Sequence, residues 1–141
     1  MQTIIAKEFR WEMGHRLPDH AGLCRNIHGH SYVADVRLCG EPDASGMVMD
    51  YFDVKTMVQP LIDELDHCFL CDRSDSVMMD FFATNAMKVV TIDVPSTAEN
   101  IAAMLLRRIV ERLPHGHSID SVTVRVFETE KTFAEVSATI R

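Results

Sequence analysis

Two stretches near the N-terminus alternate apolar with polar side chains, and this alternation limits the possible folds more than any other feature of the chain. The apolar side chains of residues 4–13 mostly share one parity, and so do those of residues 30–38. They are Ile5, Phe9, Trp11 and Met13 in the first stretch and Tyr32, Ala34, Val36 and Leu38 in the second. A period of two is typical of a β-strand that buries one face. Both stretches are therefore predicted to be strands, and they can pair as a hairpin.

A helix is predicted after the second strand. Asp53 is a good N-cap, and the apolar residues of 54–65 fall on one helical face. Pro60 interrupts this pattern, because a proline inside a helix removes a backbone donor, so a kink or a late start is expected. Residues 74–85 are expected to be irregular, and residues 87–94 favour a further strand.

The C-terminal third of the chain predicts one more helix and two strands. Ser96 and Glu99 form a capping-box pair that opens a helix over residues 100–112. Residues 119–127 and 132–140 have the composition of strands. This order of elements predicts an α+β domain in which two helices cover one face of an antiparallel sheet.

Composition fits one globular domain over residues 1–141, with 47% hydrophobic residues. The net charge is -7, which argues against a general nucleic-acid binder because such a protein needs a basic surface. No apolar run reaches membrane-spanning length and no signal-peptide pattern precedes the first strand, so a cytoplasmic protein is expected. The four cysteines are then expected to be thiols, with Cys68 and Cys71 in packing roles.

The stretch CRNIHGHSY, residues 24–32, predicts a metal site. His28 and His30 are two residues apart at the entry to a strand, so their imidazoles point to the same side, and Gly29 removes bulk between them. His15 ends the first strand on the buried parity and can meet them across the hairpin. Three imidazoles with an open fourth position are typical of catalytic zinc. The alternative is a loop whose histidines bind nothing.

Cys24 precedes these histidines and leaves two possibilities open. A thiolate near a dication is a usable base or nucleophile, but it can also be a fourth zinc ligand, which would make the metal structural. The second His-Gly-His, at His115 and His117, falls where the second helix must end and is expected to be a turn. His20 lies in a loop and is expected to be exposed.

Two further acidic positions are candidates for chemistry. Asp66 directly precedes His67 at the end of the first helix, and a carboxylate beside a histidine can orient the ring as a proton shuttle. Glu128 ends a strongly apolar strand, where a carboxylate can accept paired N–H donors from a ligand. The alternatives are a chance Asp-His pair at a helix end and an exposed residue at a sheet edge.

Together these pieces resemble the family of 6-pyruvoyl-tetrahydropterin synthase and 6-carboxy-tetrahydropterin synthase. They occur in the family's order and run through most of the chain. The pieces are MGHRL around His15, CRNIHGHSY, LDH at residues 65–67, STAEN at residues 96–100 and VFET at residues 126–129. The Cys-to-HGH segment combined with LDH and the late ET is the most specific part.

The resemblance implies the tunnelling fold (T-fold), in which protomers pool antiparallel strands into a barrel. Members of the family are usually trimers stacked as hexamers, with active sites between subunits. By the same resemblance His15, His28 and His30 hold Zn2+ as the cofactor. The expected partners are a pterin substrate and further copies of the same chain, with neither nucleic acid nor membrane.

The resemblance also implies roles for the remaining candidates. Cys24 would abstract the proton, assisted by Asp66 and His67 from a neighbouring protomer. Glu128 would anchor the 2-amino and N3 edge of the pterin and so belong to the catalytic site as well. The lining of the substrate pocket would include Thr97 and Glu99.

The implied activity is that of a lyase acting on carbon–oxygen and carbon–carbon bonds. The family substrate is 7,8-dihydroneopterin triphosphate, and one branch converts it to 6-carboxy-5,6,7,8-tetrahydropterin with release of acetaldehyde and triphosphate, toward queuosine and other 7-deazapurines. The three residues between Cys24 and His28 favour this branch. The STAEN form and the long stretch over residues 71–94 leave the pyruvoyl-forming branch as the alternative.

Two rivals from other classes remain. A non-catalytic zinc-binding module would use Cys24 as a fourth ligand. A relative similar to an aldolase would cleave dihydroneopterin itself and ignore the triphosphate, and the net charge of -7 slightly favours it. Arg16 and Arg25 are close enough to the site in sequence to supply cations for a triphosphate.

Overall fold

The computed structural model describes residues 1–141 and contains one six-stranded sheet. The strands are β1 (Thr3–His15), β2 (His28–Gly40), β3 (Cys68–Asp72), β4 (Val89–Ile92), β5 (Ile119–Thr129) and β6 (Thr132–Thr139). Their order across the sheet is β4-β3-β1-β2-β5-β6. β1, β2, β5 and β6 pair antiparallel as predicted. β3 and β4 are short strands that run parallel to β1, so the sheet has a mixed edge.

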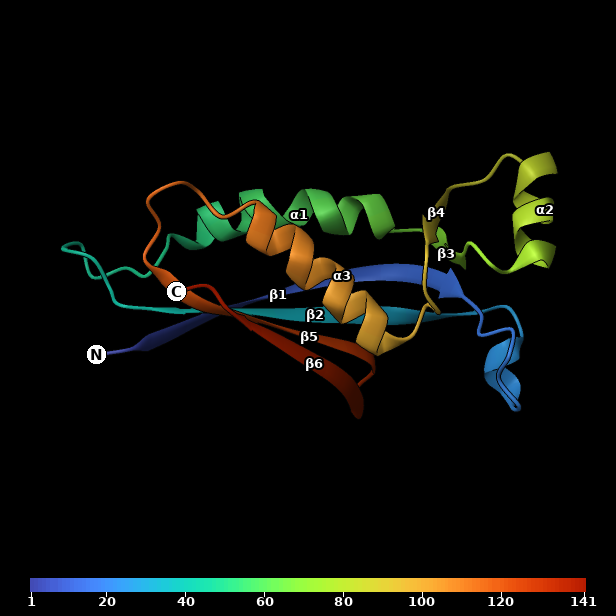
Figure 1. The fold of residues 1–141 in the computed structure, drawn as a ribbon, viewed down its shortest axis with the longest axis horizontal. Coiled ribbons are helices and arrows are strands. Elements are labelled where there is room, and N and C mark those ends of the chain that lie inside the picture. The colour runs from blue at the N-terminus through green and yellow to red at the C-terminus, as the bar shows by residue number, and fades with distance from the viewer.

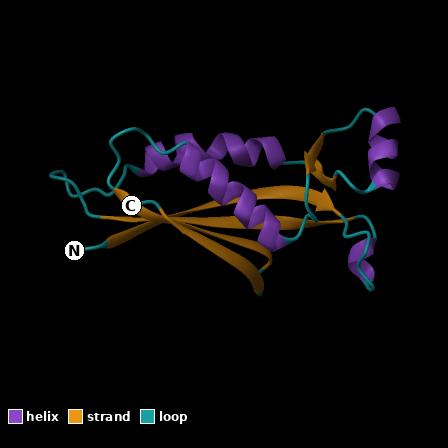
Figure 2. Ribbon diagram, viewed as in Figure 1, coloured by secondary structure: helices purple, strands orange, loops and turns teal.

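Two helices cover one face of this sheet, which confirms the predicted α+β architecture (Figures 1 and 2). α1 (Tyr51–Leu65) contacts β1, and α3 (Ala98–Glu111) contacts β5 and β6. The buried parity of β1 and β2 faces these helices and joins them in a single hydrophobic cluster. None of the helices combines the length and hydrophobicity that crossing a bilayer requires.

The hairpin of β1 and β2 is confirmed, and its register determines the site. Trp11 lies opposite Tyr32, Met13 opposite His30, and His15 opposite His28. Residues directly opposite each other in an antiparallel pair point to the same face. The buried stripe of the hairpin therefore ends in histidines rather than in aliphatic side chains.

The first helix starts earlier than predicted. Its N-cap is Asp50, whose side chain accepts a hydrogen bond from the Phe52 N–H at 2.8 Å, so the prediction of Asp53 as N-cap is wrong. Pro60 lies inside the helix, and α1 continues past it to Leu65. Six buried side chains on the inner face outweigh a proline cost of about 3 kcal/mol. These side chains are Val54, Met57, Val58, Leu61, Ile62 and Leu65.

The predicted capping box at the start of the second helix is wrong by one residue. α3 is capped by Thr97, whose hydroxyl accepts from the Asn100 N–H at 3.3 Å. Ser96 is fully buried and turns toward His15 instead. Glu99 is exposed in the first turn, where a negative charge favours the helix N-terminus.

Residues 74–85, predicted to be irregular, contain a third helix, α2 (Ser76–Thr84). Asp75 is its N-cap. α2 lies beyond β3 and β4, at the end of the sheet far from both chain termini (Figure 1). The prediction failed because SVMMDFFAT has apolar side chains on most sides, so no helical periodicity stands out.

Candidate metal centre and active site

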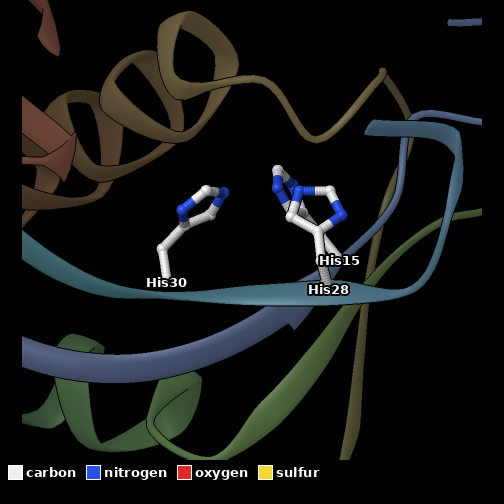
Figure 3. Close-up of side chains that lie close together, drawn as sticks. All are labelled: His15, His28 and His30. Atoms are coloured by element: carbon white, nitrogen blue, oxygen red, sulfur yellow. The ribbon is translucent and has the colours of Figure 1, made fainter. Parts of the chain in front are cut away.

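Three imidazoles meet at the end of the β1–β2 hairpin. His15 is the last residue of β1, while His28 and His30 open β2. One ligand nitrogen from each of the three rings lies within 4.8 Å of the other two. Figure 3 shows the rings projecting from the same side of the hairpin toward a common space. The sequence-based grouping of these residues therefore agrees with the geometry.

Backbone carbonyls orient two of the rings. His15 Nδ1 lies 2.8 Å from the Ser96 carbonyl oxygen, and His28 Nδ1 lies 2.8 Å from the Asn26 carbonyl oxygen. A carbonyl oxygen only accepts, so each Nδ1 must carry the proton and donate it. The lone pair is then on Nε2 in both rings, and a carbonyl in this outer position is typical of metal-bound histidine.

The third ring leaves a nitrogen without a partner. His30 Nε2 is buried and makes no hydrogen bond. Its nearest acidic atom is Glu128 Oε2 at 3.9 Å, which is too far for a hydrogen bond. A buried unpaired nitrogen is costly unless a ligand occupies it, so the His30 ring fits a metal ion. Three neutral nitrogen donors suit zinc.

Burial favours the neutral form of the His15 and His30 rings. It lowers the pKa of His15 to about 4, although the hydrogen bond to Ser96 opposes the shift. Burial also lowers the pKa of His30, against the opposing effect of Glu128. Tyr32 packs beside them, with its hydroxyl 3.4 Å from His15 Nε2, and burial raises its pKa. The neutral imidazole is the form that binds metal.

The metal-free protein is expected to lose stability as the pH falls from about 6.5 toward about 4. In this range the unfolded chain protonates His15 while the folded chain does not, because the folded pKa is about 4 against 6.5. At 1.36 kcal/mol per pKa unit, the loss in the free energy of unfolding approaches about 3 kcal/mol. Urea unfolding between about pH 7 and about pH 5, above most carboxylate titration, should show about 2 kcal/mol of this loss.

The variant His15→Gln should flatten this dependence, whereas His115→Ala should leave it unchanged, since His115 is an exposed turn residue. Equal slopes for His15→Gln and the unchanged protein would show that His15 is not the group responsible.

Glu128 is brought to the centre by an irregularity in β5. The pairing of β5 with β6 shifts between Phe127 and Thr129, so Glu128 sits at a β-bulge. Its side chain is about a quarter exposed, at 27%, and its carboxylate faces His30. Bulges re-aim side chains beside functional sites. Glu128 is therefore not the exposed edge residue of the alternative interpretation.

Cys24 lies in a short 3-10 helix, η1 (Leu23–Arg25), within the loop that joins β1 to β2. It is a half-buried free thiol, and its carbonyl accepts a hydrogen bond from the Leu17 N–H at 2.8 Å. The cluster of possible metal-ligand atoms contains the three histidines and does not include Cys24. The geometry therefore favours an open three-ligand centre over a closed four-ligand one.

The side chains of Asp66 and His67 lie against each other, as the sequence indicated. His67 Nδ1 lies 3.0 Å from Asp66 Oδ1, and the His67 side chain is 75% exposed. His67 has φ +61°, a left-handed conformation that strains a residue other than glycine. The backbone of Glu12 holds this conformation, because its carbonyl accepts from the His67 N–H at 2.6 Å and its N–H donates to Asp66 at 2.9 Å. The Glu12 N–H also lowers the pKa of Asp66.

Within one chain, no hydrogen bond joins Cys24 to Asp66 or His67. His67 lines an open hollow of about 370 Å³ at the end of the hairpin. The other lining residues are Glu12, Met13, Gly14, Gly29, His30, Ser31 and Cys68. His67 thus shares this hollow with His30, and it has no hydrogen bond to the Cys24 thiol.

The remaining candidates lie in different settings. Thr97 is half-buried at the start of α3, next to the residue that bonds His15, whereas Glu99 is exposed. Arg16 is not free to bind phosphate, because Asp75 occupies its guanidinium. His117 accepts a hydrogen bond from the Ile119 N–H at 3.0 Å, which fits the expected turn.

Sequence reasoning missed two residues that contact the centre. Tyr32 shares the parity of His30, so the alternation indicated its position although no role was assigned to it. Ser96 had no such signal, because its carbonyl reaches His15 only through the packing of α3 on the sheet.

The fold and the site together define a class of protein: a T-fold domain with a candidate metal centre at the end of its first hairpin. The family model for 6-pyruvoyl tetrahydropterin synthase matches residues 4–139. The chain belongs to this family.

Named relatives support the same family. A 6-carboxy-5,6,7,8-tetrahydropterin synthase of Haemophilus influenzae is 34% identical over 139 residues, covering 93% of this chain and 96% of its own. A protein of the same name from Synechocystis is 36% identical over 124 residues, covering 83% of each chain. These names indicate that the chain is a tetrahydropterin synthase.

Solved structures show the fold. The 6-pyruvoyl tetrahydropterin synthase of Plasmodium vivax superposes with a TM-score of 0.82 at 21% identity, covering 99% of each chain. An uncharacterized protein from Wolinella succinogenes gives a TM-score of 0.80 at 27% identity, covering 96% of this chain and 98% of its own. The predicted T-fold is therefore confirmed.

Proposed function

We propose that this protein converts 7,8-dihydroneopterin triphosphate and one water molecule to 6-carboxy-5,6,7,8-tetrahydropterin, acetaldehyde and triphosphate, in a zinc-dependent lyase reaction. The observation that carries the proposal is the three-histidine centre with Glu128 at its rim. The names of the relatives above 30% identity support the carboxy-forming branch. Residues 1–141 act as one pterin-synthase domain, whose product leads toward queuosine and other 7-deazapurines.

His15, His28 and His30 hold the zinc ion through their Nε2 atoms. Support comes from the two carbonyl-bonded Nδ1 atoms and from the unpaired His30 Nε2. Zinc bound there supplies a Lewis acid for the side-chain hydroxyls of the substrate. The open side of the centre is where the substrate enters.

Glu128 binds the 2-amino and N3 edge of the pterin and fixes the ring beside the histidines. A carboxylate that accepts two N–H donors gives both strength and orientation. Glu128 Oε2 lies 3.9 Å from His30 Nε2, which supports this role. The pterin ring can then bind to Glu128 while the substrate side chain lies at the histidines. Thr97 lines the same pocket as the N-cap of α3, and Glu99 binds the substrate from the exposed first turn of this helix.

Cys24 removes the proton from the substrate side chain. The Asp66–His67 pair delivers and accepts protons at the opposite face of the substrate. Asp66 holds the His67 ring through Nδ1, which leaves Nε2 to exchange the proton. The strained backbone of His67 supports a functional role for this pair.

The active site forms between subunits of a trimer or hexamer. Two observations support this: Cys24 makes no hydrogen bond to the Asp66–His67 pair of its own chain, and β4 and β6 each leave one sheet edge without a partner. Unpaired edges readily accept strands from another copy. A neighbouring subunit then supplies Asp66 and His67 to the Cys24 of this one.

The test is a product assay on the zinc-loaded protein with 7,8-dihydroneopterin triphosphate, using mass spectrometry and an aldehyde trap. We expect acetaldehyde and 6-carboxy-tetrahydropterin in equal amounts. A 6-pyruvoyl product without acetaldehyde would move the protein to the other branch of the family. Turnover of dihydroneopterin but not its triphosphate would favour the aldolase-like alternative.

A further inference from the structure

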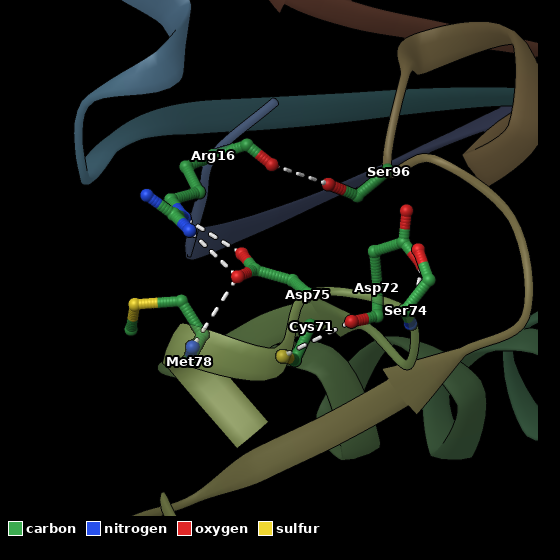
Figure 4. Close-up of polar contacts among 7 residues, drawn as sticks. All are labelled: Arg16, Cys71, Asp72, Ser74, Asp75, Met78 and Ser96. Carbon is green, nitrogen blue, oxygen red and sulfur yellow. Dashed lines mark hydrogen bonds and ion pairs between the residues drawn. The ribbon is translucent and has the colours of Figure 1, made fainter. Parts of the chain in front are cut away.

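A buried ion pair lies directly beside the metal centre and has no role in the proposed chemistry. Arg16 follows the ligand His15, and its guanidinium donates two hydrogen bonds of 2.6 Å to the two carboxylate oxygens of Asp75 (Figure 4). The side chain of Asp75 is 3% exposed and that of Arg16 is 20% exposed. A bidentate pair of this kind fixes both partners in orientation as well as in position.

Asp75 is itself held by hydrogen bonds at the start of α2, just after β3. It is the N-cap of α2, and its carboxylate accepts from the Met78 N–H at 3.3 Å. The turn from β3 into α2 is closed by Asp72, which accepts from both the Ser74 N–H and the Ser74 hydroxyl, at 2.9 and 2.8 Å. Arg16 is therefore tied to a turn that has its own hydrogen bonds.

Ser96 joins this ion pair to the metal ligand. Its hydroxyl lies 3.4 Å from the Arg16 carbonyl oxygen and 3.2 Å from His15 Nδ1, and its own carbonyl accepts from the same Nδ1 at 2.8 Å. Ser96 is fully buried. Ser96 thus contacts the His15 ring and the Arg16 carbonyl, while Asp75 holds the Arg16 side chain.

We propose that the Arg16–Asp75 pair positions His15 for metal binding and couples helix α2 to the affinity of the centre. The proposal rests on the proposed metal site but not on its substrate or product. Because the ring of His15 is oriented by the Ser96 carbonyl, a shift of residues 15–16 relative to Ser96 changes the position of Nε2 relative to the other two ligands. Loss of the ion pair permits that shift.

Asp75→Asn tests the coupling by removing the charge of the carboxylate but little of its bulk. Asparagine keeps the shape of the side chain and remains a good N-cap, so α2 keeps its start while the charge is lost. The matched control is Asp93→Asn, because Asp93 forms a bond of the same length, 2.6 Å, with Arg73 in the same region but is 79% exposed. Zinc affinity is measured by competition with a chelator, without turnover.

We expect Asp75→Asn to weaken zinc binding about 10-fold, at the lower end of the effects of outer-shell partners, and Asp93→Asn to change it less than about 2-fold. Arg16→Lys keeps the charge but loses the paired N–H donors of the guanidinium, so it should give an intermediate loss of zinc affinity. A folded Asp75→Asn protein with unchanged affinity would overturn the proposal. If His28→Ala bound zinc as tightly as the unchanged protein, the proposed metal site itself would be wrong.

Hydrogen exchange provides a second measurement on the unaltered protein. Coupling free energies are reciprocal, so a helix that raises zinc affinity 10-fold must be stabilised about 10-fold by zinc. The amides of α2 should therefore exchange about 10-fold more slowly with zinc present. A purely structural ion pair would leave their exchange independent of zinc, and that result would also overturn the proposal, even if Asp75→Asn failed to fold.

Discussion

Replacing His28 with alanine is expected to lower zinc affinity by at least about 100-fold, above the range caused by outer-shell changes, and to abolish turnover. His28 is the ligand best suited to this test. It opens β2 and is half-buried, so its removal leaves no cavity in the core. His15, in contrast, is 1% exposed, and its replacement would disturb packing as well as the metal. Chelator competition and metal analysis of the purified protein give the result.

The second His-Gly-His provides the matched control for His28→Ala. His115 has a glycine and a histidine after it, as His28 does, but it lies in the exposed turn between α3 and β5. His115→Ala should keep both zinc affinity and turnover within about 2-fold of the starting values, since exposed substitutions away from sites have small effects. Equal losses from the two variants would mean that the hairpin is not the metal site.

The contrast between the two His-Gly-His motifs also explains what the sequence could predict. Around His28 the motif continues into an alternating strand, and His15 ends a second strand of matching parity. Alternation determines the face to which each side chain points, so pairing the two strands brings the three rings together. His115 follows a helix and precedes a turn, and no parity relates it to other ligands.

Helix ends and short edge elements could not be predicted in the same way. Asp50 and Asp53 are equally suitable N-caps by type, and the local sequence does not distinguish the earlier one, which caps α1. β3 has five residues and is almost wholly buried, so it shows no alternation. α2 also shows no clear periodicity, because it is apolar on most sides. Local sequence carries little information where tertiary contacts decide.

The partnership between Cys24 and the Asp66–His67 pair was suggested by resemblance alone, and one chain does not complete it. Both elements have their own local supports: the loop bond from Leu17 for Cys24, and the backbone of Glu12 for His67. Neither of these hydrogen bonds involves the other element. No hydrogen bond joins the two elements within one chain, so a pattern read along one sequence could not locate their partnership.

Replacing Cys24 with alanine is expected to lower kcat by about 1,000-fold while leaving the fold and the zinc content unchanged. A positioned proton-transfer group contributes roughly 100- to 10,000-fold to a reaction rate. The metal should remain, because the cluster of ligand atoms consists of the three histidines without Cys24. Turnover, bound zinc and thermal unfolding are measured on the same preparation.

Cys39→Ala is the control for Cys24→Ala. Cys39 is also a half-buried free thiol, but it lies near the opposite end of β2 and contacts Gln2, so its loss should not alter turnover. If Cys24→Ala instead loses zinc and unfolds, the thiol is a fourth ligand and the metal is structural. Loss of activity with zinc retained separates the two possibilities, because a structural ligand cannot be removed without affecting the metal it holds. An inactive, folded and zinc-loaded Cys24→Ala protein would thus assign Cys24 to the reaction rather than to the metal.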